Sequence, residues 1–213
     1  RSTLSSSSAA SDVYKRQEYI LVSIGVEGNS SGFGLKKIGI EIGSNNHIIV
    51  DKNGKTNLDN FYAVGDVIGP PWLAHVSSSE GLYVVEHIAK LSPKKIDYDC
   101  VPACTYSKPE IGSIGLSQKI LDERGIDYKV VKSFFNANGK AVASDSTEGF
   151  IKILVSGRNQ ILGAHIIGSN ATEMISEFSL AMSNNLSVEN ILDSIHPHPT
   201  FSEAIFETLM QLR

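Results

Sequence analysis

The sequence predicts an α/β segment followed by an α+β domain. Residues 18–25 (EYILVSIG) form a nearly continuous apolar run that ends in glycine, which is typical of a strand buried on both faces of a parallel sheet. Residues 73–91 carry apolar side chains at helical spacing, which indicates an amphipathic helix. Further along, residues 149–155 and 161–167 are strand-like runs joined by a short turn, which predicts an antiparallel hairpin.

We place the α/β segment at residues 18–96. After the first strand and a glycine-rich loop, residues 48–56 read as a hairpin-like piece that turns at DKNG. Residues 61–66 (FYAVGD) then predict a strand with Gly65 and Asp66 at its carboxyl end. The amphipathic helix follows this strand, as it does in α/β units.

We place the α+β domain at residues 97–213. Short apolar runs alternate there with turn residues and with helical patterns. The expected elements are extended stretches at 104–107 and 111–115, a helix at 117–124 stopped by Gly125, a strand at 128–135, the hairpin, and helices at 171–183, 188–194 and 201–212.

Composition narrows the class of protein. The chain has 213 residues, of which 41% are hydrophobic, which fits a globular protein with a proper core. Its net charge is −4 and it has no basic block, so neither nucleic acid nor an anionic membrane is an expected partner. No apolar run approaches the length of a membrane span. Two cysteines do not make a disulfide framework, which favours a reducing compartment.

The first residues differ from the rest. Residues 1–17 (RSTLSSSSAASDVYKRQ) are rich in serine and have neither the apolar centre of a signal peptide nor a helical period. We expect them to be a non-native or disordered leader without function. Because the sequence does not start with Met, we also expect the chain to be a piece of a larger protein.

The motif at residues 196–203 (HPHPTFSE) is the main candidate for chemistry. Histidine takes up and returns protons near neutral pH, and the proline after His198 keeps that residue in an extended conformation. Thr200 or Ser202 is expected to cap the following helix, which places Glu203 in its first turn. Glu203 could then accept a hydrogen bond from the imidazole and orient it as a base. Taken alone, such a pair also fits an ordinary surface loop.

A second candidate lies at the end of the strand expected at residues 61–66. Ligands of open α/β sheets bind beyond the carboxyl ends of strands, where Gly65 would let the backbone approach and Asp66 could hold sugar-type hydroxyls. The next helix would point its positive N-terminal end at the same place. Taken alone, the motif equally fits a strand-to-helix turn capped by aspartate.

Together these motifs resemble one family, the dihydrolipoyl dehydrogenases of the class I pyridine nucleotide-disulfide oxidoreductases. The similarity covers the chain from Glu18 onward and matches the C-terminal half of that family in order and spacing. It is carried by Thr56, AVGD at 63–66, LAH at 73–75, EG at 80–81, PEIGSIGL at 109–116 and the terminal HPHPTFSE.

The resemblance implies a fold and a site. It implies that residues 18–96 are part of an FAD/NAD(P)-binding Rossmann-like segment and that residues 97–213 are a dimerisation (interface) domain. His198 would be the base that takes the proton of a dithiol, and Glu203 would orient it.

The cofactor-binding residues that the resemblance implies lie in the first segment. Asp66, next to Gly65, would hydrogen-bond the ribityl chain of FAD. The backbone at Leu73, Ala74 and His75 would face the pyrimidine end of the flavin.

The resemblance also implies cofactors and partners. FAD and NAD would be the cofactors, and dihydrolipoamide would be oxidised with NAD+ as acceptor. The enzyme would be a homodimer in which His198 and Glu203 act on the partner's flavin. Lipoyl domains of 2-oxo acid dehydrogenase or glycine cleavage complexes would be its partners, in bacterial cytoplasm or in an organelle matrix.

Two features of the complete family are missing from this sequence. It contains no Gly-x-Gly-x-x-Gly after a strand, and no Cys-x4-Cys. Cys100 and Cys104 are separated by three residues, so we do not expect them to be a redox pair. We therefore expect the 213-residue chain by itself to be inactive.

Other readings stay open at this point. Within the class, the chain could belong to another flavin disulfide reductase of the glutathione or mercuric reductase type. A zinc-binding structural module could use Cys100, Cys104, His196 and His198 as ligands. A non-catalytic dimerisation module is a further alternative.

Overall fold

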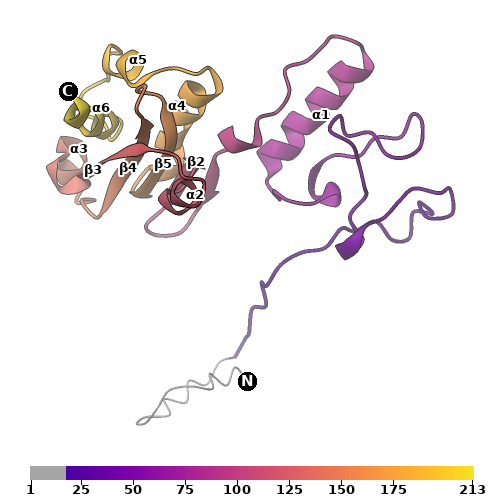
Figure 1. Cartoon of the computed structure of the whole chain (residues 1–213). Coiled ribbons are helices and arrows are strands. Elements are labelled where there is room, and N and C mark those ends of the chain that lie inside the picture. Colours follow the sequence, from indigo (N-terminus) through magenta and orange to yellow (C-terminus); the bar gives the residue numbers. More distant parts are fainter. Residues whose placement is uncertain (1–17) are drawn as a thin grey trace.

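The computed structural model describes residues 18–213, so the leader expected at residues 1–17 lies outside the described residues. Figure 1 shows two lobes, a smaller one around helix α1 (Ala74–Ile88) and a larger one built on a β-sheet. The segment between them carries a 3₁₀ turn at Tyr98–Cys100. Helix α1 confirms the helix expected from the apolar spacing of this region.

The larger lobe contains one five-stranded antiparallel sheet with the strand order β1-β2-β5-β4-β3. Its strands are β1 (Ala103–Thr105), β2 (Ile111–Gly115), β3 (Tyr128–Phe134), β4 (Gly149–Ser156) and β5 (Ile161–Gly168). β4 and β5 form the expected hairpin, in which Phe150 lies opposite Ile167. The α+β class expected for this region is therefore confirmed.

Short helices connect and cover the strands. They are α2 (Gln118–Glu123), α3 (Gly139–Ala143), α4 (Ala171–Ser183), α5 (Val188–Leu192) and α6 (Glu203–Leu209). α4 has the bounds that its apolar spacing predicts. α3 was not expected, because a helix of 5 residues is too short to show a helical period in the sequence.

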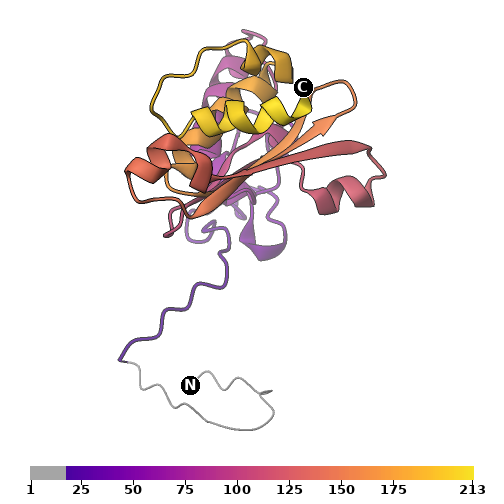
Figure 2. The ribbon, with the colours of Figure 1, turned by 90° about the vertical axis from the view of Figure 1, so that its left-hand side faces the viewer.

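The core lies between one face of the sheet and helices α4 and α6 (Figure 2). Alternate residues of β4 point into it, as the two-residue period of a strand requires. α4 contributes the apolar face expected from the sequence. The core residues of these elements include Ile151, Ile153 and Val155 of β4, Met174, Ile175 and Phe178 of α4, and Ala204, Ile205 and Leu209 of α6.

The strand expected at residues 18–25 does not form. This segment is extended but pairs with no strand among the described residues, and its side chains are exposed. A strand buried on both faces needs neighbouring strands and covering helices, and residues 26–213 place none beside it. The prediction of a buried strand at residues 18–25 is therefore wrong.

The strand expected at residues 61–66 is also wrong. The pairing of this segment with the preceding turn is limited to an isolated bridge between Lys55 and Tyr62. Gly65 then adopts a φ of +76°, and the chain continues as a 3₁₀ helix at Gly65–Ile68. The positive φ of this glycine ends the extended conformation before Asp66.

Candidate active site

His198 and Glu203 lie together at the N-terminal end of α6. The Nδ1 atom of His198 is 2.8 Å from Oε1 of Glu203. Because a carboxylate can only accept, this contact requires the proton of a neutral His198 to be on Nδ1. The Nε2 atom is then an acceptor, and no protein partner for it is found within residues 18–213.

The Glu203 carboxylate also fixes the backbone. Its Oε2 atom accepts a hydrogen bond of 2.8 Å from the Thr200 N–H. This contact and then the one with His198 lower the pKa of Glu203. The expected capping by Thr200 or Ser202 is wrong, because neither side chain caps α6. The Thr200 hydroxyl instead donates to the Pro197 carbonyl at 2.8 Å.

The two histidines of the motif have different surroundings. The His198 side chain is 76% exposed, whereas that of His196 is 9% exposed. Nε2 of His196 lies 2.9 Å from the Glu177 carboxylate of α4, and its Nδ1 lies 3.2 Å from the Ser194 carbonyl. Both ring nitrogens of His196 thus face acceptors inside the lobe. Only His198 presents a nitrogen that could take a proton from a substrate.

The second candidate site lies at the start of α1. Asp66 is exposed, and no hydrogen-bond partner for its carboxylate is found within the described residues. α1 has no side-chain cap, and among residues 18–213 no acceptor is found for the N–H groups of Ala74 and His75. The side chain of His75 points elsewhere, since its Nε2 lies 2.9 Å from the Pro102 carbonyl. An exposed carboxylate and unpaired helix N–H groups therefore share one surface.

Glu80 connects the loop before Asp66 to α1. The sequence did not predict this contact. Its buried carboxylate accepts a hydrogen bond of 2.7 Å from the Gly65 N–H and one of 2.7 Å from the Tyr98 hydroxyl. Burial and then the contact with Glu80 raise the pKa of Tyr98 to about 12. Glu80 thus ties the loop before Asp66 to α1. The EG pair at residues 80–81 was part of the family resemblance, but it did not predict the hydrogen bonds of Glu80.

Gly65 is required here by close packing. A Cβ atom added to it would lie 2.9 Å from the Ser77 hydroxyl of α1. Leu73 is the N-cap residue of α1 and accepts the N–H groups of Val76 and Ser77. The loop that carries Asp66 therefore lies directly against the first turn of the helix.

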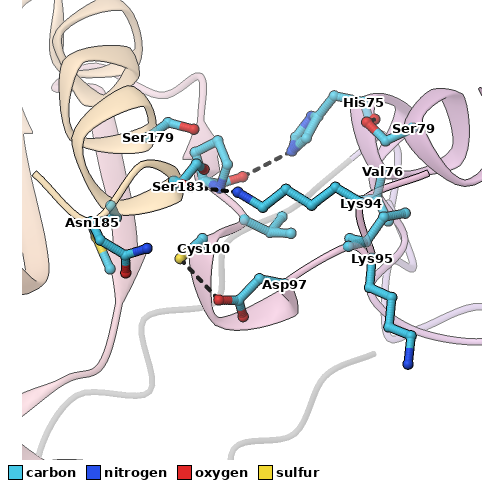
Figure 3. Close-up of a pocket in the computed structure, with 14 residues that line it drawn as sticks. His75, Val76, Ser79, Lys94, Lys95, Asp97, Cys100, Ser179, Ser183 and Asn185 are labelled. Atoms are coloured by element: carbon cyan, nitrogen blue, oxygen red, sulfur yellow. Dashed lines mark hydrogen bonds between the residues drawn. The ribbon is translucent and has the colours of Figure 1, made fainter. Parts of the chain in front are cut away.

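A cavity of about 550 Å³ lies between α1 and the C-terminal end of α4 (Figure 3). Lys94 donates to the Ser183 carbonyl at 2.7 Å, and His75 donates to the Pro102 carbonyl on its wall. The Cys100 thiol is 3.4 Å from the Asp97 carboxylate. Lys94, His75 and Cys100 are thus paired with the protein, and the cavity lies between the two lobes.

The cysteines and histidines are not brought together. Within residues 18–213 no group of three or more His, Cys, Asp or Glu side chains is placed to hold a metal ion, so the zinc module is not supported. Cys100 and Cys104 are both free. Burial and then Asp97 raise the pKa of Cys100 to about 11, and burial raises the pKa of Cys104. Neither thiol has the lowered pKa of a redox cysteine.

Comparison with known families gives two matches. Residues 101–209 match the dimerisation domain of the pyridine nucleotide-disulphide oxidoreductases. Residues 9–81 match a second region, described as pyridine nucleotide-disulphide oxidoreductase. The first match contains the sheet and the pair formed by His198 and Glu203, and the second contains Asp66 and the start of α1.

Several curated proteins are similar to the chain. The mitochondrial dihydrolipoyl dehydrogenase of Caenorhabditis elegans is 40% identical over 189 residues, which are 88% of this chain and 38% of that protein. A dihydrolipoyl dehydrogenase of Bacillus subtilis is 39% identical over 191 residues, 89% of this chain and 40% of that protein. The chain thus spans about 40% of the length of the curated relatives it matches.

Solved structures of two other proteins share the fold of this chain. LpdA from Mycobacterium tuberculosis superposes with a TM-score of 0.83 at 26% identity, covering 88% of this chain and 41% of LpdA. The flavoprotein disulfide reductase RclA from Escherichia coli superposes with a TM-score of 0.79 at 25% identity, covering 88% of this chain and 43% of RclA.

Proposed function

The chain belongs to the pyridine nucleotide-disulphide oxidoreductase family. On that premise we propose that it is part of a dihydrolipoyl dehydrogenase, which oxidises dihydrolipoamide with NAD+ as acceptor. The observation that carries this proposal is the pair formed by His198 and Glu203. One nitrogen of His198 is held by the carboxylate, and the other is exposed and without a protein partner among the described residues. The similarity to dihydrolipoyl dehydrogenases at about 40% identity supports the choice within the family.

His198 would act as the base in oxidation of a dithiol. Its Nε2 would accept the proton of a thiol S–H, which leaves a thiolate able to attack a disulfide. The positive charge that forms on the ring would be balanced by Glu203, which stays ionised because its pKa is lowered by Thr200 and His198. Bound FAD and NAD would supply the redox chemistry.

Asp66 and the start of α1 would hold the FAD. The exposed carboxylate suits the hydroxyls of a ribityl chain, and the N–H groups of Ala74 and His75 suit an electron-rich ring edge. Gly65 and Leu73 would shape the backbone on either side of this surface. The carboxylate acceptor of Asp66 and the N–H donors of Ala74 and His75 therefore suit the flavin half of FAD.

We propose a homodimer as the working state. The matched family domain is a dimerisation domain, and the His198 ring is exposed and accessible to a second subunit. In this homodimer, His198 and Glu203 would meet the partner's flavin in a composite site. The partners would be the lipoyl domains of 2-oxo acid dehydrogenase or glycine cleavage complexes, in bacterial cytoplasm or in an organelle matrix.

Neither nucleic acid nor a membrane is proposed as a partner. The net charge is −4, and the charge pattern shows no basic block. Among the described residues, no helix has the length and apolar character needed to cross a membrane.

The proposal is tested in the full-length protein by replacing His198 with Gln. Loss of a general base should lower the rate of dihydrolipoamide oxidation by about two to four powers of ten while FAD stays bound. Glu203→Gln should lower it less, because Glu203 only orients the base. His196→Gln is the matched control, since His196 faces acceptors inside the lobe, and it should retain most of the activity.

Mixing of subunits then tests the composite site. A His198→Gln subunit paired with a subunit that lacks the family's redox cysteines should restore about half the activity of the wild-type dimer, because one intact site remains. If His198 served its own subunit, mixing would restore nothing. Oxidation of NADH with glutathione disulfide, in place of lipoamide, would contradict the proposed substrate.

A further inference from the structure

Asn138 is a buried polar residue that lies behind the His198 loop. It precedes α3, far from residues 196–203 in the sequence, and is 1% exposed. Its Oδ1 atom accepts a hydrogen bond of 3.0 Å from the Ala141 N–H, which caps α3. Its Nδ2 atom donates a hydrogen bond of 3.1 Å to the Thr200 carbonyl. One side chain thus serves two separate elements.

The peptide groups on both sides of Thr200 are held by side chains. Asn138 holds the carbonyl, and Glu203 accepts the N–H at 2.8 Å. The same Glu203 carboxylate contacts His198 through its other oxygen. Asn138 is therefore linked to the imidazole by three hydrogen bonds, joined through the backbone of Thr200 and the carboxylate of Glu203.

We propose that Asn138 is a positioning residue, which fixes the backbone of Thr200 and through it the orientation of Glu203 against His198. The inference rests on the proposed function, because it assigns Asn138 to the base of that reaction. Without Asn138, Thr200 could rotate, and its N–H would no longer hold Glu203 in the rotamer that reaches Nδ1 of His198. The ring would then lose its fixed tautomer.

A second contact, which is apolar, also joins the His198 loop to the Asn138 turn. Phe135, next to the Asn138 turn, contacts Phe201 edge to face with ring centroids 5.8 Å apart, and both rings are buried. This apolar contact already joins the two segments. The hydrogen bond from Asn138 Nδ2 in addition fixes the orientation of the Thr200 carbonyl, which an apolar contact does not do.

Two variants separate positioning from capping. Asn138→Asp keeps an oxygen that can cap α3 but turns a carboxylate oxygen toward the Thr200 carbonyl, so two acceptors face each other. Asn138→Ser keeps a capping hydroxyl without added charge and is too short to reach Thr200. Ser117→Ala is the control, because Ser117 caps α2 through the Ile120 N–H at 3.3 Å and has no contact with residues 196–203.

The experiment records ring-nitrogen NMR spectra and amide hydrogen exchange of the full 213-residue chain, with the His198 signals assigned from His198→Gln. The wild type should show the Nδ1–H tautomer of neutral His198. Both Asn138 variants should show a mixture of tautomers, and the Thr200 N–H should exchange about tenfold faster relative to the β4 amides. Ser117→Ala should change neither.

An unchanged tautomer and unchanged Thr200 exchange in a folded Asn138→Ser chain would overturn the inference. If Asn138→Asp does not fold, Asn138→Ser decides alone, and a loss of β4 protection in both variants would show a purely structural role and also overturn it. The proposed function is judged separately. Full activity of His198→Gln would refute that function, whereas the tautomer of His198 would still report whether Asn138 positions the ring.

Discussion

The two lobes differ in how far they bury their apolar side chains. The sheet lobe encloses large side chains completely, among them Phe135, Phe178 and Leu209. In the α1 lobe, residues 18–96, only Ile40, Ile48, Val76 and Val84 form a buried apolar set, and many larger ones stay exposed. The sheet lobe therefore contains its own hydrophobic core, whereas most apolar side chains of the α1 lobe are exposed to solvent.

Helix α1 shows this difference most clearly. Val76, Glu80 and Val84 face the protein, whereas Leu82, Val85 and Ile88 of the apolar spacing point outward. A helix of 15 residues is marginal by itself, because most helical stability in proteins comes from packing. The comparison teaches that most buried apolar contacts lie in the sheet lobe, while the α1 lobe leaves much of its apolar surface exposed.

The largest expected effect is a cavity in the sheet lobe. Phe178→Ala should lower the free energy of unfolding by about 3–5 kcal/mol, because Phe178 lies on the inner face of α4 and is fully buried in the core. Denaturant unfolding followed by circular dichroism measures this change. Leu82→Ala is the matched control in the α1 lobe, and a loss as large as that of Phe178→Ala would break the comparison.

The next effect concerns ligand binding by the α1 lobe. In the full-length protein, Asp66→Ala should weaken FAD binding by about 1.5–3 kcal/mol, because it removes a charge-assisted hydrogen bond. Fluorescence titration of the apoprotein with FAD gives the change in Kd. Asp59→Ala is a suitable control, since this exposed residue pairs only with Lys55 among residues 18–213. Equal FAD affinity of the Asp66 variant and the wild type would contradict the assignment.

A smaller effect is expected from acid titration of the sheet lobe. The Thr200 N–H and then His198 lower the pKa of Glu203 below its ordinary value of 4.5. The folded state therefore binds this proton more weakly than the unfolded state does. The stability from this carboxylate is complete above about pH 4.5 and is lost as the pH falls through the lower folded pKa.

Glu203→Gln should remove this part of the acid sensitivity, as measured by unfolding at a series of pH values below 5. Glu207 provides a control of opposite sign. Burial and then the charge of Glu203 raise its pKa, so its protonation on acidification favours the folded state. A steeper acid loss in the Glu203→Gln variant than in the wild type would contradict the assigned contact with Thr200.

The smallest effect is expected on the outer face of α1. Val85→Lys should change the free energy of unfolding of the chain by no more than about 0.5 kcal/mol, because Val85 is 65% exposed and covers no core. Thermal unfolding gives this value. Val84→Lys is the control one residue away, where a buried charge should destabilise the lobe clearly. A large loss in Val85→Lys would show that this face is covered in solution.

The sequence by itself determined the sheet lobe to a large extent. The hairpin of β4 and β5, the bounds of α4 and the stop of α2 before Gly125 follow from local patterns, because period and turn chemistry act over a few residues. The motif with His198 and Glu203 was also visible, since its two partners lie on one short segment. The Rossmann-like class of the first region was visible from its motifs rather than from a paired sheet.

Only the tertiary structure decided which partner each group has. The apolar runs at 18–25 and 61–66 predicted strands, but periodicity does not tell whether a neighbouring strand is present. The contacts of Glu80 with Gly65, of His196 with Glu177 and of Asn138 with Thr200 join residues 15, 19 and 62 positions apart. The folded backbone sets such contacts, and a single sequence records the residue types but not the distances between them.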